Sequence, residues 1–241
     1  MSKFKQTDIH FQSDNLMLTG TLHLPDSIIK NPPCIIGSHG LFSDASSPKQ
    51  IALSNECNIR NMAYFRFDHR GCGRSEGIFK TVTTIRQRFQ DFRDAIKTIL
   101  NHPDTGNKVG FFGSSLGGSI ALLAGISYKP QAIVTLSAPI SMNSVWEVLI
   151  QNKQDQLLSN EFYQEALEFD ILNQLSVINH TLIFHGSKDE VVPLANANQI
   201  YEHVREPKKL IVLDGGCHRL SQTHHQNTFM KNAVDWFEQY L

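Results

Sequence analysis

The chain has 241 residues, of which 41% are hydrophobic and 19% charged, so its composition is that of a globular protein and not of a disordered or fibrous one. Lysine and arginine number 22 and aspartate and glutamate 23, which gives a net charge of −1 and argues against binding of nucleic acid through a basic surface. The length fits one large α/β domain that can bury a sizeable core without disulfides.

Targeting signals and cysteine spacing narrow the cellular setting. No apolar run approaches the roughly 20 residues that a membrane helix needs, and the first fifteen residues lack the apolar segment of a signal peptide. The four cysteines, at positions 34, 57, 72 and 217, form no Cys-x-x-Cys pair, which favours reduced thiols over a zinc site or a redox dithiol. We therefore expect a cytoplasmic protein without a membrane span.

Two strand-like segments open the chain. Ile9 and Phe11 alternate with polar neighbours, and Leu16–Leu24 shows the same period of two residues. The dipeptide Asp14-Asn15 between them is typical of a hairpin turn. The sequence therefore predicts an antiparallel hairpin at the amino terminus.

From Cys34 onward, short apolar runs alternate with longer stretches of helical periodicity. The clearest helical pattern places Ile85, Phe89, Phe92 and Ile99 on one face. Such alternation predicts an α/β fold with a mostly parallel sheet of about eight strands and helices on both faces, with the hairpin as its antiparallel edge. The later strand-like runs begin at Cys34, Met62, Lys108, Ala132, Thr181 and Lys209.

One connection is longer than a simple crossover requires. About 40 residues separate the apolar run that ends near Ile140 from the strand that starts near Thr181, and their aromatic and aliphatic side chains suggest amphipathic helices. Ligand sites in such sheets lie beyond the carboxyl ends of the strands. We therefore expect a single domain, 1–241, with a helical lid inserted at about 140–179; a purely structural excursion is the alternative.

The sharpest chemical signal is the segment Gly113–Gly117, which has the form G-x-S-x-G. It directly follows the apolar run Val109–Phe112 and directly precedes a helical stretch, so it fits the strand-turn-helix context of a nucleophile elbow. The amino terminus of the following helix would favour negative charge developing near Ser115. The motif predicts Ser115 as a catalytic nucleophile.

A serine nucleophile needs a base and a third group that orients the base, and in this type of site they follow in the order Ser, acid, His. Asp189 comes just after the strand-like run that starts at Thr181, and His218 follows the last strand-like run at once. Both therefore fall at the same sheet edge as Ser115. We predict Asp189 as the acid and His218 as the base.

Other residues compete for these roles. Glu190 is an alternative acid, whereas Asp214 is expected to cap the turn before His218. His185 is expected to pack where its strand ends, and His224 and His225, inside the last helix, are expected to face solvent.

An acyl-transfer site also needs hydrogen-bond donors for the oxyanion. One donor should be the backbone N–H of Leu116, the residue after the nucleophile, and the second should come from the loop after the third strand. That loop contains Gly40, which allows a close backbone approach, followed by Leu41. The predicted oxyanion hole therefore consists of the Leu41 and Leu116 N–H groups.

A fourth motif, the D-x-R-G-x-G-x-S segment within Asp68–Gly77, completes a pattern that resembles the α/β-hydrolase superfamily. The resemblance points to the serine aminopeptidase-like and monoacylglycerol-lipase-like branch, and the chain is similar to small carboxylesterases such as the cinnamoyl and feruloyl esterases. The resemblance implies the triad and the oxyanion positions that the motifs predict. It also implies that Asp68 and Arg70 form a buried ion pair that holds a turn.

The expected function is hydrolysis of a carboxylic ester with a small or medium acyl or aromatic group, through a Ser-His-Asp triad and an acyl-enzyme. The expected partner is a small-molecule ester, without a metal, an organic cofactor or nucleic acid. A peptidase or thioesterase with the same triad, or a non-catalytic binding protein on the same scaffold, are the alternatives. The oligomeric state stays open, with a homodimer as one option.

Overall fold

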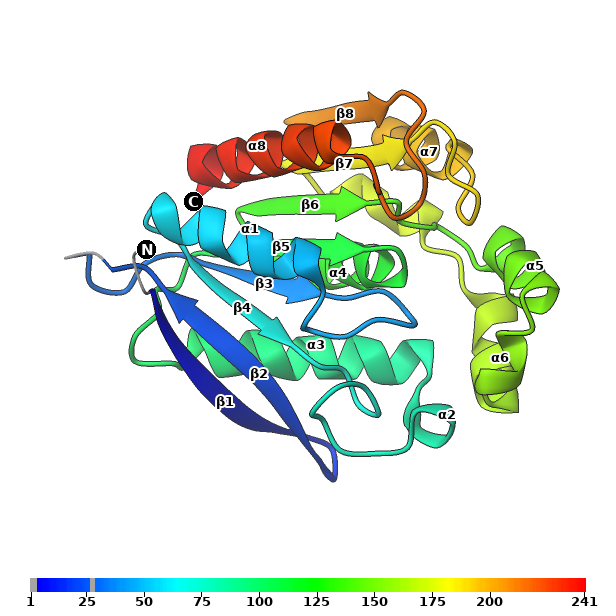
Figure 1. Cartoon of the computed structure of the whole chain (residues 1–241), viewed down its shortest axis with the longest axis horizontal. Coiled ribbons are helices and arrows are strands. Elements are labelled where there is room, and N and C mark those ends of the chain that lie inside the picture. Colours follow the sequence, from blue (N-terminus) through cyan, green and yellow to red (C-terminus); the bar gives the residue numbers. More distant parts are fainter. Residues whose placement is uncertain (1–3, 27–28) are drawn as a thin grey trace.

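A computed structural model describes residues 4–26 and 29–241, and its strands form one eight-stranded sheet (Figure 1). The strand order is β1-β2-β4-β3-β5-β6-β7-β8, and all neighbours from β4 to β8 run parallel. The predicted α/β class and number of strands are confirmed. The strands are β1 (Lys5–Ser13), β2 (Leu16–Leu24), β3 (Cys34–Ser38), β4 (Ala63–Phe67), β5 (Val109–Ser114), β6 (Ala132–Leu136), β7 (Thr181–Gly186) and β8 (Lys208–Leu213).

The predicted hairpin forms the antiparallel edge of the sheet. Ser13 pairs with Leu16, so the turn between β1 and β2 consists of only Asp14 and Asn15. Asp14 has a φ of 50°, a left-handed conformation that aspartate and asparagine tolerate better than most residues. β2 also pairs antiparallel with β4, and this pairing joins the hairpin to the parallel strands.

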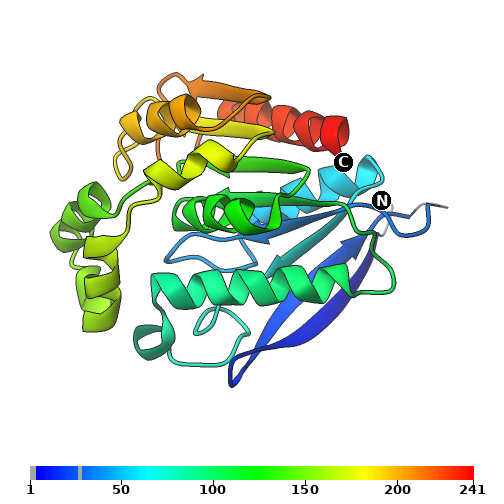
Figure 2. The same ribbon diagram turned by 180° about the vertical axis from the view of Figure 1, so that it is seen from behind.

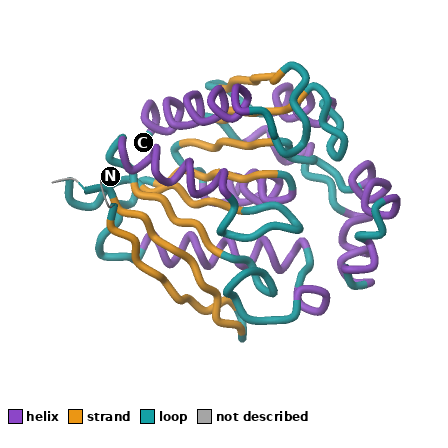
Figure 3. The backbone as a smooth tube through the Cα atoms, viewed as in Figure 1, coloured by secondary structure: helices purple, strands orange, loops and turns teal. Residues whose placement is uncertain are grey.

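Helices cover both faces of the sheet (Figures 1 and 2), and the backbone tube shows the sheet enclosed between them (Figure 3). α1 and α8 pack together on one face, while α3 and α4 pack together on the other, beside α7. These helices are α1 (Pro48–Ile59), α3 (Ile85–Leu100), α4 (Leu116–Tyr128), α7 (Ala195–His203) and α8 (Thr223–Tyr240), with the short α2 (Phe79–Val82) before α3.

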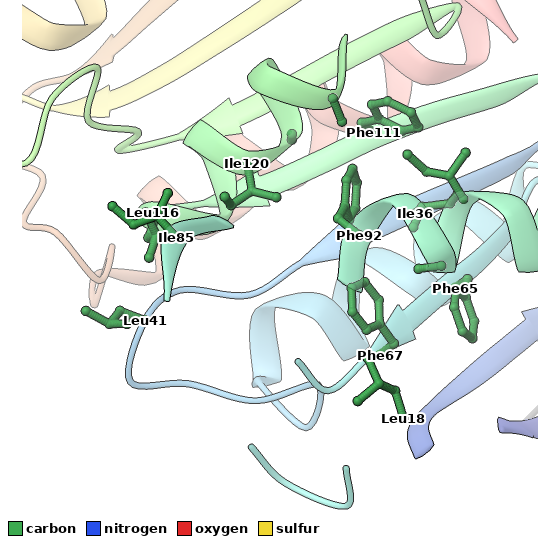
Figure 4. Close-up of a cluster of buried hydrophobic side chains, with 14 of the residues drawn as sticks. Leu18, Ile36, Leu41, Phe65, Phe67, Ile85, Phe92, Phe111, Leu116 and Ile120 are labelled. Atoms are coloured by element: carbon green, nitrogen blue, oxygen red, sulfur yellow. The ribbon is translucent and has the colours of Figure 1, made fainter. Parts of the chain in front are cut away.

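The apolar face predicted from the 85–99 periodicity is the face by which α3 packs on the sheet (Figure 4). Phe92 lies at its centre, with its ring 5.1 Å from that of Phe111 on β5 and 6.2 Å from that of Phe67 on β4. At the start of the helix, the Thr84 hydroxyl accepts a hydrogen bond from the backbone N–H of Gln87. The helix is therefore capped at one end and fixed to the sheet along one side.

The long connection between β6 and β7 is helical, as expected. It contains α5 (Asn143–Gln151), α6 (Asn160–Glu168) and the 3₁₀ segments η1 (Asp155–Leu157) and η2 (Leu172–Val177). α5 and α6 stand beyond the carboxyl ends of the strands, whereas η2 packs against α4 and α7 (Figures 1 and 2). Only the first part of the connection therefore overhangs the sheet edge, and we call α5, η1 and α6 the cover.

Candidate active site

Ser115 lies at the sharp turn between β5 and α4. Its φ is 55°, a left-handed value that is uncommon for a residue with a side chain and is typical of a strained functional turn. A Cβ atom at Gly113 would overlap the carbonyl of Gly117, and one at Gly117 would overlap the carbonyl of Ser38. The two glycines of the motif are therefore required by space, because the turn folds against itself and against the end of β3.

The structure brings Ser115, His218 and Asp189 together from three separate loops. The His218 Nε2 atom lies 3.2 Å from the Ser115 Oγ atom, and its Nδ1 atom lies 2.9 Å from both carboxylate oxygens of Asp189. A carboxylate accepts only, so Nδ1 carries the proton and Nε2 is left free to accept a proton from the serine hydroxyl. The three groups form one continuous hydrogen-bonded chain.

Backbone hydrogen bonds hold the Asp189 carboxylate in place independently of His218. Its side chain is fully buried, and its Oδ1 atom accepts backbone N–H bonds from Val191 at 2.9 Å and from Val192 at 2.8 Å. Burial alone would raise the pKa of Asp189, but the hydrogen bonds from His218 and from the backbone outweigh it and lower that pKa below its ordinary value. The carboxylate is therefore charged and held in one orientation toward His218.

The competing residues lie close to these three but make other contacts. The Glu190 carboxylate accepts the backbone N–H of His218 at 3.0 Å, so it holds the loop and does not contact the imidazole. Asp214 accepts a hydrogen bond from the Ser187 hydroxyl. His185 is buried, as expected, and its Nε2 atom donates to the carbonyl of Val192.

The expectation for one of the two helical histidines is wrong. His224 is exposed, but His225 is buried and its Nε2 atom donates to the carbonyl of Asp214 at 2.9 Å. Adjacent positions on a helix point about 100° apart, so only one of the pair can face outward when the helix packs on the sheet. His225 thereby fixes the start of the loop that carries His218.

Leu41 and Leu116 stand on either side of the nucleophile. A Cβ atom on Gly40 would lie 3.4 Å from the Cβ of Ser115, so the Gly40–Leu41 backbone passes directly beside the serine. Within the described residues, neither the Leu41 nor the Leu116 N–H has a hydrogen-bond acceptor. Both donors are thus free near Ser115, and their role as an oxyanion hole stays a prediction.

Arg88 on α3 binds the backbone of the loop that contains Gly40 and Leu41. The sequence analysis did not identify this residue. Its side chain is fully buried, and its guanidinium donates to the carbonyls of His39 at 3.4 Å, Gly40 at 3.2 Å and Leu41 at 2.8 Å. In a trans peptide the C=O and N–H groups point in opposite directions, so a fixed Gly40 carbonyl turns the Leu41 N–H away from Arg88. The sequence feature that could have identified Arg88 is the presence of a charged residue on the otherwise apolar face of α3.

The expected ion pair between Asp68 and Arg70 is wrong. The Arg70 guanidinium instead pairs with the fully buried Asp91 of α3, with its Nε atom at 2.8 Å, and with Asp14 at 3.1 Å. The Asp68 carboxylate accepts the backbone N–H groups of Ala45 and Arg74. The motif therefore closes its own loop through Asp68 and also binds the hairpin turn, α3 and the loop after β3.

A cavity of about 1060 Å³ opens above Ser115 and His218. One wall is the loop after β3, and another is formed by the α5 side chains Val145, Val148 and Leu149. Among the residues that the structure describes, no cluster of His, Cys, Asp or Glu could hold a metal ion, and every helix is too short or too polar to cross a bilayer. The arrangement places a hydroxyl, an imidazole and two free N–H groups beside a space for a small molecule.

Comparison with known proteins gives a family match. The family model described as serine aminopeptidase, S33, matches residues 31–176, which is more than half of the chain. The mitochondrial palmitoyl-protein thioesterase ABHD10 of Rattus norvegicus is 26% identical over 219 residues, which cover 80% of this chain and 71% of that protein. The uncharacterized protein YfhR of Escherichia coli K12 is 26% identical over 210 residues, covering 84% of this chain and 69% of that protein.

Solved structures show the same fold at low sequence identity. The α/β hydrolase GrgF from Penicillium sp. sh18 superposes with a TM-score of 0.81 at 18% identity, covering 98% of this chain and 99% of that one. Est1E from Butyrivibrio proteoclasticus, solved with ferulic acid bound, has the same TM-score and identity and covers 96% of this chain and 98% of that one. The chain thus has the α/β-hydrolase fold predicted from its sequence.

Proposed function

The chain belongs to the serine aminopeptidase (S33) family, and from this premise we propose that it is a serine hydrolase that cleaves a carboxylic ester. The observation that carries the proposal is the unbroken chain of contacts from the Ser115 hydroxyl through His218 to the buried Asp189. Ser115 and His218 line a cavity that is large enough for a small or medium substrate.

In the proposed reaction, Ser115 Oγ attacks the ester carbonyl carbon while its proton passes to His218 Nε2. Asp189 keeps the imidazole in the required tautomer and stabilises its positive form without taking the proton. The protonated His218 then gives its proton to the leaving alkoxide, which departs as an alcohol. Water, deprotonated by His218, releases the acid from the acyl-enzyme and restores the serine.

The proposed oxyanion hole is the pair of free N–H groups at Leu41 and Leu116. Both would donate to the carbonyl oxygen when it becomes negatively charged in the tetrahedral intermediate. Leu116 also begins α4, whose amino-terminal dipole favours negative charge at this point. Loss of one such donor typically raises the barrier by about 3 kcal/mol.

The charges around the cavity favour an ester over a peptide with a free amino terminus. An aminopeptidase needs a carboxylate for the substrate ammonium group, and Glu190, the acidic residue of the cavity wall besides the buried triad, already accepts the His218 N–H. On the cover, Glu165 accepts the backbone N–H of Arg86. A thioester is the second candidate, supported by the sequence similarity to the palmitoyl-protein thioesterase ABHD10.

We further propose that the cover acts as a lid on a single domain. Its α5 side chains line the cavity, and its α6 helix contacts α3 of the main body. Access of substrate to Ser115 would therefore depend on the position of these two helices.

The deciding experiment is labelling with a fluorophosphonate probe, followed by location of the modified peptide by mass spectrometry. We expect stoichiometric modification at Ser115 that is lost in Ser115→Ala and strongly slowed in His218→Ala. A matched control is His224→Ala, an exposed histidine outside the site, which should label at the wild-type rate. A folded wild-type protein that does not label at Ser115 would overturn the proposal.

Substrate class is then resolved by comparing an ester, a thioester and an amide substrate. We expect p-nitrophenyl butyrate to be hydrolysed with a higher kcat/KM than butyryl-CoA, and both well above an alanine p-nitroanilide. A higher kcat/KM for the thioester would replace the carboxylesterase assignment with a thioesterase, and a preference for the anilide would replace it with a peptidase.

A further inference from the structure

The cavity continues past Ser115 along the sheet face that α1 and α8 cover. Its lining there includes the apolar side chains of Phe112, Phe229 and Met230. Polar residues interrupt this lining, among them Lys49 and Gln50, which both come from the first turn of α1. This end of α1 lies at the sheet edge that carries the site (Figure 1).

Lys49 has no partner for its charge. In the part of the chain that the structure describes, its ammonium group makes no ion pair and no hydrogen bond, although the side chain is partly buried. Burial lowers the pKa of Lys49 to about 8, with the charges of Cys217 and Asp189 opposing that shift, so the group is still mainly cationic at neutral pH. An unpaired cation in such a place is costly unless something anionic joins it.

Gln50 beside it has an unused donor. The residue is only 2% exposed, and its Oε1 atom accepts the Tyr64 hydroxyl at 3.1 Å. Its Nε2 atom has no acceptor among residues 4–26 and 29–241. That atom is shielded from the cavity, so Gln50 fixes the first turn of α1 against Tyr64 and leaves Lys49 as the accessible donor of this turn.

We propose that Lys49 forms a subsite for a carboxylate that the substrate carries beyond its scissile ester. The proposal rests on the proposed function, because it concerns the same cavity. A carboxylate is acceptor-only and negatively charged, which matches an unpaired ammonium group with three N–H donors. The uncapped amino terminus of α1 adds a favourable dipole.

The subsite defines a substrate class. The apolar side chains that line the same part of the cavity would contact a hydrocarbon segment of the substrate, and the carboxylate would lie at the end of that segment. Substrates of this form are monoesters of dicarboxylic acids or esters of hydroxy acids. Arg219, an exposed cation that also lines the cavity, would attract such anions toward the opening.

Binding can be measured without turnover in the Ser115→Ala variant. By calorimetry, we expect monomethyl suberate to bind about tenfold or more tightly than the neutral dimethyl suberate, because one charged hydrogen bond is added. In the same background, Lys49→Met should remove the difference and Lys49→Arg should keep it. Lys209→Met removes one exposed lysine at the opposite edge of the sheet and should leave the difference as it was.

Turnover gives a second readout. We expect the wild-type enzyme to prefer the p-nitrophenyl monoester of suberic acid over its methyl-capped analogue in kcat/KM, and Lys49→Met to reduce that ratio about tenfold. Equal binding of the charged and neutral ligands, or a preference that survives in Lys49→Met, would overturn the subsite.

The two proposals fail in distinguishable ways. If Ser115 labels and neutral esters are cleaved without a Lys49-dependent preference for the carboxylate, the subsite alone is wrong. If Ser115 does not label but monomethyl suberate binds through Lys49, the hydrolase mechanism is wrong and the subsite stands.

Discussion

Two walls of the same cavity are held by different kinds of interaction. The wall that carries Gly40 and Leu41 is fixed by buried polar contacts, because Arg88 binds three successive carbonyls and the Asp68 carboxylate accepts the Ala45 N–H. The cover is fixed mainly by apolar packing around the buried Phe162. Its polar contacts with the main body include two exposed ones, from Lys80 to the Gln156 carbonyl and from the Arg86 N–H to Glu165.

The difference follows from what each wall does in the proposed reaction. Oxyanion donors must keep their positions to within a few tenths of an ångström, and directional hydrogen bonds to a buried cation provide that accuracy. A wall that only encloses an acyl chain needs shape and an apolar surface, for which packing is enough. Exposed apolar side chains on the cover, such as Ile150, Leu157 and Leu167, are in keeping with a looser attachment.

The largest expected effect separates the main body from the cover by stability. Phe92 and Phe162 are both fully buried, but the first lies between α3 and the sheet and the second in the cover. Phe92→Ala should lower the global free energy of unfolding by about 3–5 kcal/mol. Phe162→Ala should lower it less and should accelerate amide hydrogen exchange in α5 and α6. Equal losses in urea unfolding would show that cover and body unfold as one unit.

Asp91→Asn should cost about 3 kcal/mol at pH 7, because the buried Arg70 guanidinium loses its charged partner. Burial raises the pKa of Asp91, but the His69 ring 3.4 Å away and the hydrogen-bonded Arg70 guanidinium outweigh it, so the pKa lies below its ordinary value. A lowered folded-state pKa stabilises the fold above the unfolded value of about 3.9, and this contribution is lost as the pH falls through the folded value. The stability gap between wild type and Asp91→Asn should therefore narrow below about pH 4 in urea titrations.

Arg88→Met tests the polar wall directly. Without the guanidinium, the Gly40 carbonyl is no longer fixed from behind, and we expect kcat to fall about a hundredfold with little change in KM. Arg88→Lys, which keeps the charge and part of the hydrogen bonding, should recover part of the loss. A tetrahedral boronate inhibitor should lose affinity in parallel with kcat, whereas a proportional rise in KM would point to general damage of the cavity.

The smallest effect is expected on the cover. Glu165→Gln weakens an exposed contact with Arg86 and should change the free energy of unfolding by less than about 1 kcal/mol. If the cover limits access, a bulky fluorophosphonate should label Ser115 faster in Glu165→Gln than in the wild type. A small fluorophosphonate should label the two proteins at the same rate. Identical acceleration for both probes would speak against a gating role.

Much of the fold was predictable because its signals are local. The turn at Asp14-Asn15, the face of α3 that contains Phe92, and the strand-turn-helix at Ser115 each depend on residues close together in the chain. The positions of Asp189 and His218 were predictable for the same reason, since each follows directly after a strand whose carboxyl end meets the same sheet edge.

What the sequence by itself determined is the α/β class, the order of the strand-like runs and the set of loops that meet at one edge. The tertiary structure alone decided that Arg70 pairs with Asp91, that His225 is buried, and that Arg88 and Lys49 face the loop and the cavity. Local periodicity and turn chemistry act within a few residues, whereas the partner of a buried charge is chosen by packing between segments far apart in the chain, and no pattern along the sequence records that choice.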